Sequence, residues 1–145
     1  MNLKNHKQLG EIGERIAIGE LSKYGIDIML PMSDNLPFDF IVYINNKFYK
    51  CQVKTTNKKQ TTNSYHFSLT SNNWNKKTEY LYTKNDYDVL ICCNLTTIFL
   101  FKYSDVQGKK NISIRDCLTK NNQTKNINFY NDCIISEERL KYIFN

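Results

Sequence analysis

The chain has 145 residues, of which 41% are hydrophobic and 23% are charged, and its formal net charge is +6. This length and composition predict one globular domain over residues 1–145. No run of about 18 apolar residues and no signal-peptide pattern is present, so we expect neither a membrane span nor secretion. The basic excess favours a polyanionic partner, although it is equally typical of a solvated surface.

The cysteines number five and contain no CxxC pair. An odd number without metal-ligand spacing predicts free thiols in a reducing compartment. We therefore expect a cytoplasmic protein, or one associated with the nucleoid or the nucleus.

The first predicted element is a helix over residues 4–24, where apolar residues recur at helical spacing. Gly25 is a plausible residue to end it. A short apolar stretch covers residues 26–30, and residues 31–37 form a loop rich in turn residues.

Two strands follow, at residues 38–44 and 47–56, joined by an Asn45-Asn46 turn. A third strand is expected at residues 65–70. Residues 71–84 are predicted to be helical or a turn, with Trp74 packing inward.

The second half of the chain contains two apolar strands, residues 88–93 and 97–103. Residues from 109 onward alternate weakly, and Ser136 is the expected N-cap of a last helix that ends near residue 144. The order of elements predicts an α/β fold with a mixed central sheet flanked by helices.

Candidate chemistry begins in the second of the paired strands. Cys51 and Val53 fall on one face, and Gln52 and Lys54 on the other, about 7 Å apart along the strand. Taken alone, this pattern is more typical of an amphipathic strand with a hydrated face.

The preceding strand places a carboxylate close by. Asp39 stands between Phe38 and Phe40, where burial is costly without a partner. A hairpin about Asn45-Asn46 brings Asp39 near Lys54, whereas a turn-capping role after Pro37 is the alternative.

The N-terminal helix offers another acid. At about 100° per residue, Glu14 lies within the apolar stripe of the helix and Glu11 lies about 60° to one side. The alternative is that Leu9, Ile12 and Ile16 face inward and leave Glu14 in water.

Together these residues predict a site for a hard divalent cation. Glu14, Asp39, Gln52 and the carbonyl of Val53 are oxygen ligands, for which Mg²⁺ is the best match and Mn²⁺ the expected substitute. Such a cation polarises a phosphodiester and activates bound water, while Lys54 orients or deprotonates the nucleophile.

The pattern Glu14, Asp39, Gln52-Val53-Lys54 resembles the PD-(D/E)XK nuclease superfamily, in its branch of group I intron homing endonucleases. The residues that resemble the branch are GEIGE at 10–14, PMSDNLPFDFIVYINNKFYKCQVKTT at 31–56, YDVLICC at 87–93, IFLFKYSDV at 98–106 and ISIRDCLTKNNQTKNINFYNDC at 112–133. Glutamine in place of the last acid is typical of that branch, whereas Cys117 to Thr119 departs from its pattern.

The resemblance implies catalytic Glu14, Asp39, Gln52 and Lys54, with Glu11 as a rival to Glu14. It implies Mg²⁺ dependence, cleavage to a 5′-phosphate, and an oligomer, since one site cuts one strand. A dimer or tetramer is therefore expected on duplex DNA.

Candidate DNA contacts lie in two segments. Lys58 and Lys59 belong to a polar loop beside Lys54, although a flexible loop without contacts is an equal alternative. Through the resemblance, Arg115, Asn122 and Gln123 are further candidates.

The functional prediction is a Mg²⁺-dependent endonuclease that hydrolyses duplex DNA at specific sites, of homing or restriction type. Two alternatives remain. One is a structure-specific nuclease of the Holliday-junction resolvase kind, and the other is a nucleic-acid-binding module without catalysis.

Overall fold

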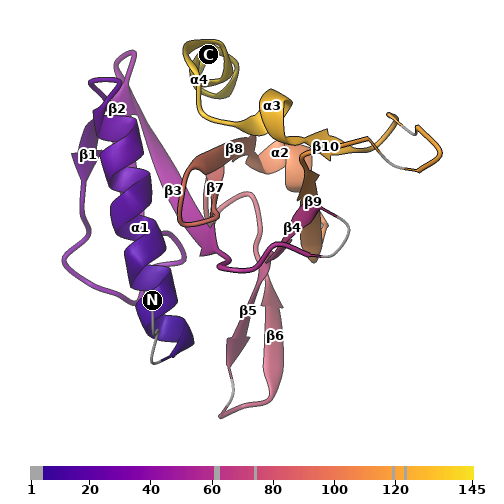
Figure 1. Ribbon diagram of the computed structural model, residues 1–145. Helices are drawn as coiled ribbons and strands as arrows, with labels where there is room; N and C mark the ends of the chain where they lie inside the picture. The colour runs from indigo at the N-terminus through magenta and orange to yellow at the C-terminus, as the bar shows by residue number, and fades with distance from the viewer. Residues whose placement is uncertain (1–4, 61–62, 74, 119, 123) are drawn as a thin grey trace.

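The computed structural model of the protein describes residues 5–60, 63–73, 75–118, 120–122 and 124–145. Its centre is a mixed five-stranded sheet in the order β1-β2-β3-β7-β8 (Figure 1). Only β3 and β7 are parallel among these neighbours. The strands are β1 (Asp27–Met29), β2 (Phe40–Ile44), β3 (Lys47–Thr55), β7 (Val89–Cys93) and β8 (Ile98–Lys102).

The hairpin of β2 and β3 forms about Asn45 and Asn46, as predicted. Both asparagines have positive φ, 53° and 60°, as a two-residue turn between antiparallel strands requires. The turn sets the register that pairs Phe40 with Cys51.

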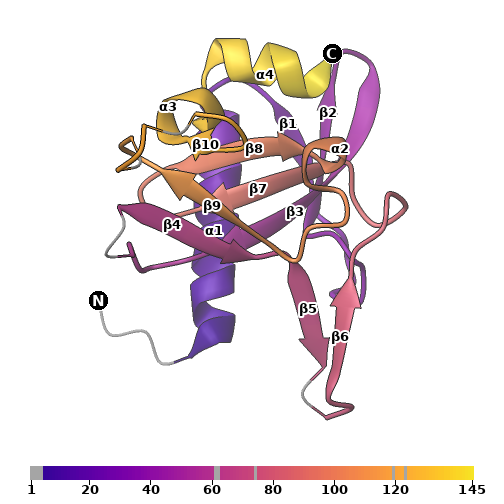
Figure 2. The ribbon, with the colours of Figure 1, turned by 90° about the vertical axis from the view of Figure 1, so that its right-hand side faces the viewer.

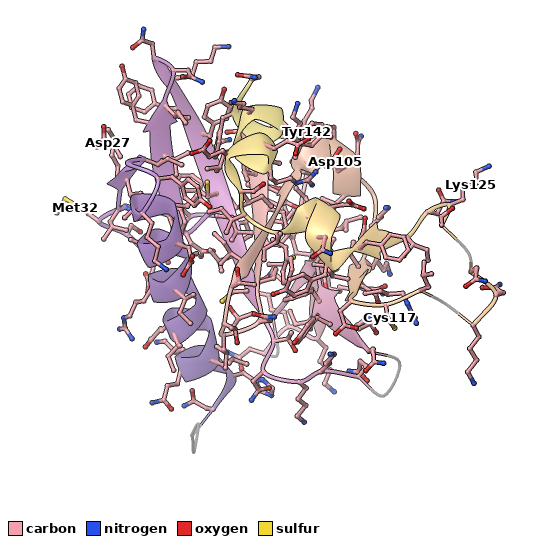
Figure 3. The ribbon with its side chains drawn as sticks, turned by 45° about the horizontal axis from the view of Figure 1, so that its top comes forward. Asp27, Met32, Asp105, Cys117, Lys125 and Tyr142 are labelled. Atoms are coloured by element: carbon pink, nitrogen blue, oxygen red, sulfur yellow. The ribbon has the colours of Figure 1, made fainter. Side chains whose placement is uncertain are left out.

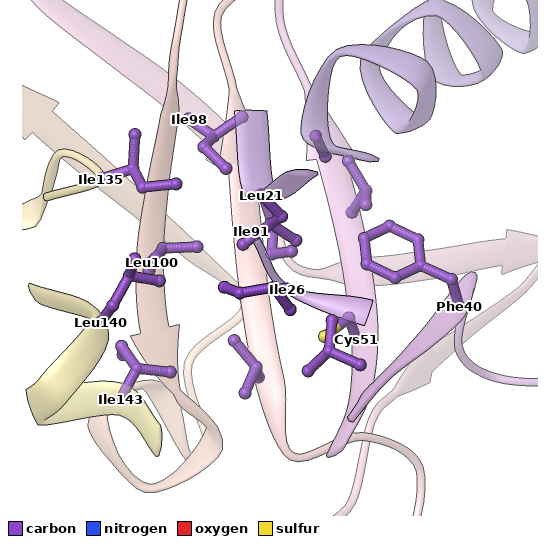
Figure 4. Packing of buried hydrophobic residues seen from close by; sticks show 14 of the residues in the cluster. Leu21, Ile26, Phe40, Cys51, Ile91, Ile98, Leu100, Ile135, Leu140 and Ile143 are labelled. Carbon is purple, nitrogen blue, oxygen red and sulfur yellow. The ribbon is translucent and has the colours of Figure 1, made fainter. Parts of the chain in front are cut away.

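Helices cover one face of this sheet. α1 (His6–Ser22) and α4 (Glu137–Phe144) pack on sheet side chains that include Phe40, Ile91 and Leu100, with Leu21 of α1 buried among them (Figure 4). Gly25, with φ 70°, follows α1, and the Ser136 hydroxyl accepts a hydrogen bond from the Arg139 N–H at 3.0 Å to cap α4. Both helices, and the mixed sheet they flank, were predicted.

A second, three-stranded sheet covers the opposite face, in the order β10-β9-β4 (Figure 2). Between the two sheets lies a second apolar cluster that contains Phe67, Leu90, Phe99 and Ile114. Both faces of β7 and of the middle of β3, at residues 51–53, are consequently buried. The elements are β4 (Ser64–Ser68), β9 (Asn111–Arg115) and β10 (Asn128–Phe129), with the short helices α2 (Tyr103–Val106) and α3 (Tyr130–Cys133).

The prediction for residues 71–84 was wrong. They contribute to a hairpin of β5 (Thr70–Asn73) and β6 (Thr78–Leu81), which projects from the body of the protein in both views (Figures 1 and 2). Lys77, with φ 48°, belongs to the turn. The strands are polar, so they lack the apolar alternation that marks a half-buried strand. The predicted inward packing of Trp74 lies outside the described residues.

The cysteines, a contact between two helices and the lengths of the helices complete the description of the fold. All five cysteines are free; Cys117 is exposed and the others are buried. Tyr142 of α4 donates a hydrogen bond to the Asp105 carboxylate of α2 at 2.7 Å (Figure 3). Within the described residues, no helix has both the length and the apolar character needed to cross a membrane.

Candidate active site

Asp39 immediately precedes the first residue of β2, at a point where β3 continues past β2. Its N–H donates to the Cys51 carbonyl at 2.8 Å. Its carboxylate Oδ2 accepts from the Val53 N–H at 2.6 Å and from Gln52 Nε2 at 2.9 Å. The side chain thereby satisfies a backbone donor that β2 is too short to reach, which makes its position part of the sheet.

Gln52 is buried, with 7% of its surface exposed. The hydrated face expected for an isolated amphipathic strand is therefore absent here, because the second sheet covers it. Besides Asp39, the Gln52 amide donates to the Val53 carbonyl at 3.2 Å. These bonds join the carboxylate, the amide and the carbonyl in one network.

Lys54 extends from the same face of β3 as Gln52, since their partners on β7 are Cys92 and Leu90 of the second cluster. Its ammonium donates to the Thr70 carbonyl at 3.2 Å and to the Tyr82 hydroxyl at 3.5 Å. Burial lowers the pKa of Lys54, and the nearby Asp39 carboxylate opposes that shift. In the part of the chain that the structure describes, no ion pair joins Lys54 to Asp39.

Glu14 reaches this end of the sheet from α1. Gly13, Ala17 and Leu21 are the buried residues of the helix, so the predicted stripe faces inward at Ala17 and Leu21, whereas Tyr24, also expected in it, is exposed. Leu9, Ile12 and Ile16, the alternative face, are only partly buried. Glu14 and Asp39 line one cleft of about 640 Å³ together with residues of the loop that follows β1.

The Asp39 charge acts on Glu14, and burial acts on both acids. Burial, followed by the Asp39 charge and then the Glu11 charge, raises the pKa of Glu14 to about 6, while Arg15 opposes the shift. Burial also raises the pKa of Asp39, against the hydrogen bond from the Val53 N–H and the charge of Lys54. Two partly desolvated carboxylates that disfavour joint ionisation are well suited to hold a cation between them.

Glu11 does not line the cleft. Its charge raises the pKa of Glu14, but less than burial and the Asp39 charge do. Of the two candidates on α1, the geometry thus favours Glu14 as the acid that faces Asp39.

The donor set fits a hard metal ion. Among the described residues, no group of three or more His, Cys, Asp or Glu side chains is arranged around a common point. The predicted ligands include only two carboxylates, the others being the Gln52 amide and the Val53 carbonyl. All four donors are oxygens, which matches Mg²⁺ or Mn²⁺ better than a metal that prefers sulfur or nitrogen.

The candidate DNA contacts lie apart from this cleft. Lys59 forms an ion pair with Asp116 and its ammonium lies 5.9 Å from the Tyr65 ring centroid, whereas Lys58 is exposed. Arg115 donates to the Cys117 carbonyl at 3.4 Å and lines a separate cavity of about 410 Å³ beside β9 and β10. Asn122 is exposed with φ 52°, and Gln123 lies outside the described residues.

Sequence reasoning missed three residues around the site. Gly13 lies against Thr55 of β3 and brings α1 close to the sheet; a glycine inside a helical pattern was the available signal. Tyr82 and the carbonyl of Thr70 contact Lys54. No local pattern marks either one, because both contacts join residues far apart in the chain.

Comparisons with known proteins point the same way. A family model described as PD-(D/E)XK endonuclease matches residues 4–133. Among solved structures, the chain is similar to that of a bacterial homing endonuclease, I-Ssp6803I, with a TM-score of 0.69 and 23% identity over 83% of this chain and 84% of that one. No curated protein matches the chain.

Proposed function

Because the chain belongs to the PD-(D/E)XK endonuclease family, we propose that it is a Mg²⁺-dependent endonuclease that hydrolyses duplex DNA at specific sites. The observation that carries this proposal is the shared cleft of Glu14 and Asp39. Asp39 also accepts a hydrogen bond from Gln52, which belongs to the same strand, β3, as Lys54. Acids, amide and ammonium thus converge at one end of the sheet.

Each residue has a distinct part in the proposed reaction. Glu14, Asp39, Gln52 and the Val53 carbonyl would hold the metal ion, which when bound polarises the scissile phosphodiester and lowers the pKa of water. Asp39 keeps its position through the bonds to β3, so its carboxylate needs little reorganisation on binding. Lys54 either orients the attacking water as an ammonium or, as a neutral amine, accepts the proton of that water and becomes an ammonium. In both cases the ammonium stabilises the charge that develops on the phosphate.

The partner in this proposal is DNA, and the active form is a homo-oligomer. A net charge of +6 favours association with a polyanion. One site of this kind cuts one strand, so a double-strand break requires two sites, as a dimer or tetramer supplies. The similarity to a protein named as a homing endonuclease supports a defined target sequence, and the free cysteines support an intracellular setting.

The deciding experiment measures cleavage of a supercoiled plasmid, a linear duplex library and a four-way junction. Wild type and Lys54→Ala are compared with Mg²⁺ and with EDTA. We expect Mg²⁺-dependent cleavage of duplex DNA that Lys54→Ala abolishes while DNA binding persists. Preference for the junction would instead identify a resolvase. Salt-sensitive binding without cleavage of any substrate would identify a binding module.

A further inference from the structure

The surroundings of the Lys54 ammonium are supplied by the base of the β5–β6 hairpin. Thr70, whose carbonyl accepts from Lys54 at 3.2 Å, is the first residue of β5. Tyr82, whose hydroxyl lies 3.5 Å from the same nitrogen, directly follows the last residue of β6. The two contacts therefore come from the two strands where the hairpin joins the body.

The Tyr82 ring adds a second kind of contact. The Lys54 ammonium lies 4.9 Å from the ring centroid, within the range in which an aromatic ring attracts a cation. A lysine side chain is a flexible four-carbon stem, and fixing it in one rotamer costs about 2 kcal/mol of conformational entropy. The contacts with the Thr70 carbonyl and with Tyr82 favour one of the many positions open to the ammonium before substrate arrives.

Tyr82 is itself held firmly. Its ring meets the Tyr80 ring edge-on at 5.6 Å between centroids and the Tyr87 ring at 5.5 Å. Its backbone carbonyl accepts a hydrogen bond from the Tyr103 hydroxyl at 3.3 Å. Tyr87 is buried, with 2% of its surface exposed, so Tyr82 is anchored to the core as well as to the hairpin.

Tyr82 also forms part of a wall that a substrate can reach. With Tyr80 and Ser71 it lines a groove of about 580 Å³ between the hairpin and the loop that precedes β2. Leu36 lines this groove and also the cleft of Glu14 and Asp39. The groove and the cleft therefore adjoin, and Tyr82 stands between the groove and the lysine.

We propose that the base of the β5–β6 hairpin, through Tyr82 and the Thr70 carbonyl, positions the Lys54 ammonium for phosphodiester hydrolysis. Tyr82 is a positioning residue that acts through Lys54 and does not touch the reacting atoms. This inference rests on the proposed nuclease function, because only that function gives Lys54 its part in the reaction.

The test compares Tyr82→Leu, which removes ring and hydroxyl, with Tyr82→Phe, which keeps the ring. Tyr142→Leu is the matched control, since the Tyr142 ring also lies against a lysine ammonium, that of Lys102 at 4.5 Å, but belongs to α4 and not to the hairpin. Single-turnover cleavage is measured at saturating duplex DNA, and DNA affinity is measured in EDTA. Thermal melts verify that each variant folds.

We expect Tyr82→Leu to slow single-turnover cleavage roughly 10- to 100-fold, the scale of loss when a reacting group is misplaced by about an ångström. Tyr82→Phe should retain most of the wild-type rate, because it keeps the ring. DNA affinity should be unchanged in both variants. Wild-type rates in Tyr82→Leu, or an equal loss in Tyr142→Leu, would overturn the proposal.

A second readout needs no activity. In the free protein, the Tyr82 ring should shift the NMR signals of the Lys54 ε-methylene group, and Tyr82→Leu should move them toward those of an exposed lysine. If wild type cleaves nothing, the nuclease function fails, yet these signals still decide whether Tyr82 holds Lys54. Unchanged signals in Tyr82→Leu would refute the positioning role even in an active nuclease.

Discussion

Gly13 of α1 and Thr55 of β3 are in direct contact. A Cβ atom on Gly13 would lie 1.8 Å from Thr55 Oγ1 and 2.8 Å from the Thr55 Cβ and Cγ2 atoms. Thr55 Oγ1 is also a buried oxygen without a hydrogen-bond partner among the described residues. Since Glu14 is the next residue of the helix, this contact sets how near its carboxylate comes to Asp39.

Gly13→Ala is expected to destabilise the protein by about 2 kcal/mol, because overpacking of this kind outweighs the helix propensity gained from alanine. Cleavage should fall as well, since α1 must move outward and carry Glu14 with it. Urea denaturation and a plasmid-cleavage assay measure the two effects.

Gly19→Ala is the matched control for this substitution. A Cβ on Gly19 meets nothing within 4 Å, so the variant should gain up to about 1 kcal/mol and keep its activity. Equal stability of Gly13→Ala and Gly19→Ala would contradict the close α1–β3 contact. A partial rescue of Gly13→Ala by Thr55→Gly would support it.

The parts of the site that sequence reasoning predicted are those fixed by local patterns. The Asn45-Asn46 turn was predicted to bring Asp39 near Lys54, and the register it sets places Asp39 in hydrogen-bond contact with Gln52 and Val53, the two residues that precede Lys54. Helical periodicity alone placed Glu14 on the buried side of α1. Both inferences needed only residues a few turns or one hairpin apart.

The parts that it missed depend on contacts between distant residues. Lys54 meets Tyr82 across 28 positions, and Lys59 meets Asp116 across 57. The hairpin that supplies Tyr82 is polar, and its strands are defined by pairing with each other rather than by an apolar face. Neither periodicity nor composition marks such a hairpin, because those signals report burial.

Glu14→Gln is expected to stabilise the metal-free protein at neutral pH and to change little in acid. Burial, and then the Asp39 charge, raises the pKa of Glu14 from 4.5 to about 6. The folded protein thus keeps this proton to higher pH than the unfolded chain, so stability decreases as pH rises from 4.5 to about 6. The full shift corresponds to about 2 kcal/mol, and solvent around this partly exposed carboxylate reduces the effect to about 1 kcal/mol.

Urea denaturation of both proteins, below pH 4.5 and above pH 6, measures this difference. Glu11→Gln serves as the control, and its effect should be smaller because Glu11 does not line the cleft. Mg²⁺ should stabilise wild type more than Glu14→Gln, since a ligand that binds the folded state selectively adds stability. A Glu14→Gln variant with the same advantage at both pH values would argue against a charge penalty at this position.

Lys58 and Lys59 should contribute unequally to DNA binding, although they are adjacent in the sequence. Both side chains are exposed, but the Lys59 ammonium forms an ion pair with Asp116 that a phosphate would have to displace. Affinity falls as salt rises, and each phosphate contact makes the plot of log affinity against log salt steeper by about one unit. Lys58→Ala should therefore reduce the steepness of that plot by about one unit, and Lys59→Ala should reduce it by less.

Fluorescence anisotropy with duplex DNA over a range of salt concentrations measures these slopes. Asp116→Asn should raise both the affinity and the slope, because it releases Lys59 for a phosphate. Lys23→Ala is the control: Lys23 pairs with Glu20 on α1, away from the polar loop, and its loss should leave the slope unchanged. Equal losses of slope in Lys58→Ala and Lys59→Ala would mean that the Lys59–Asp116 pair opens when DNA binds.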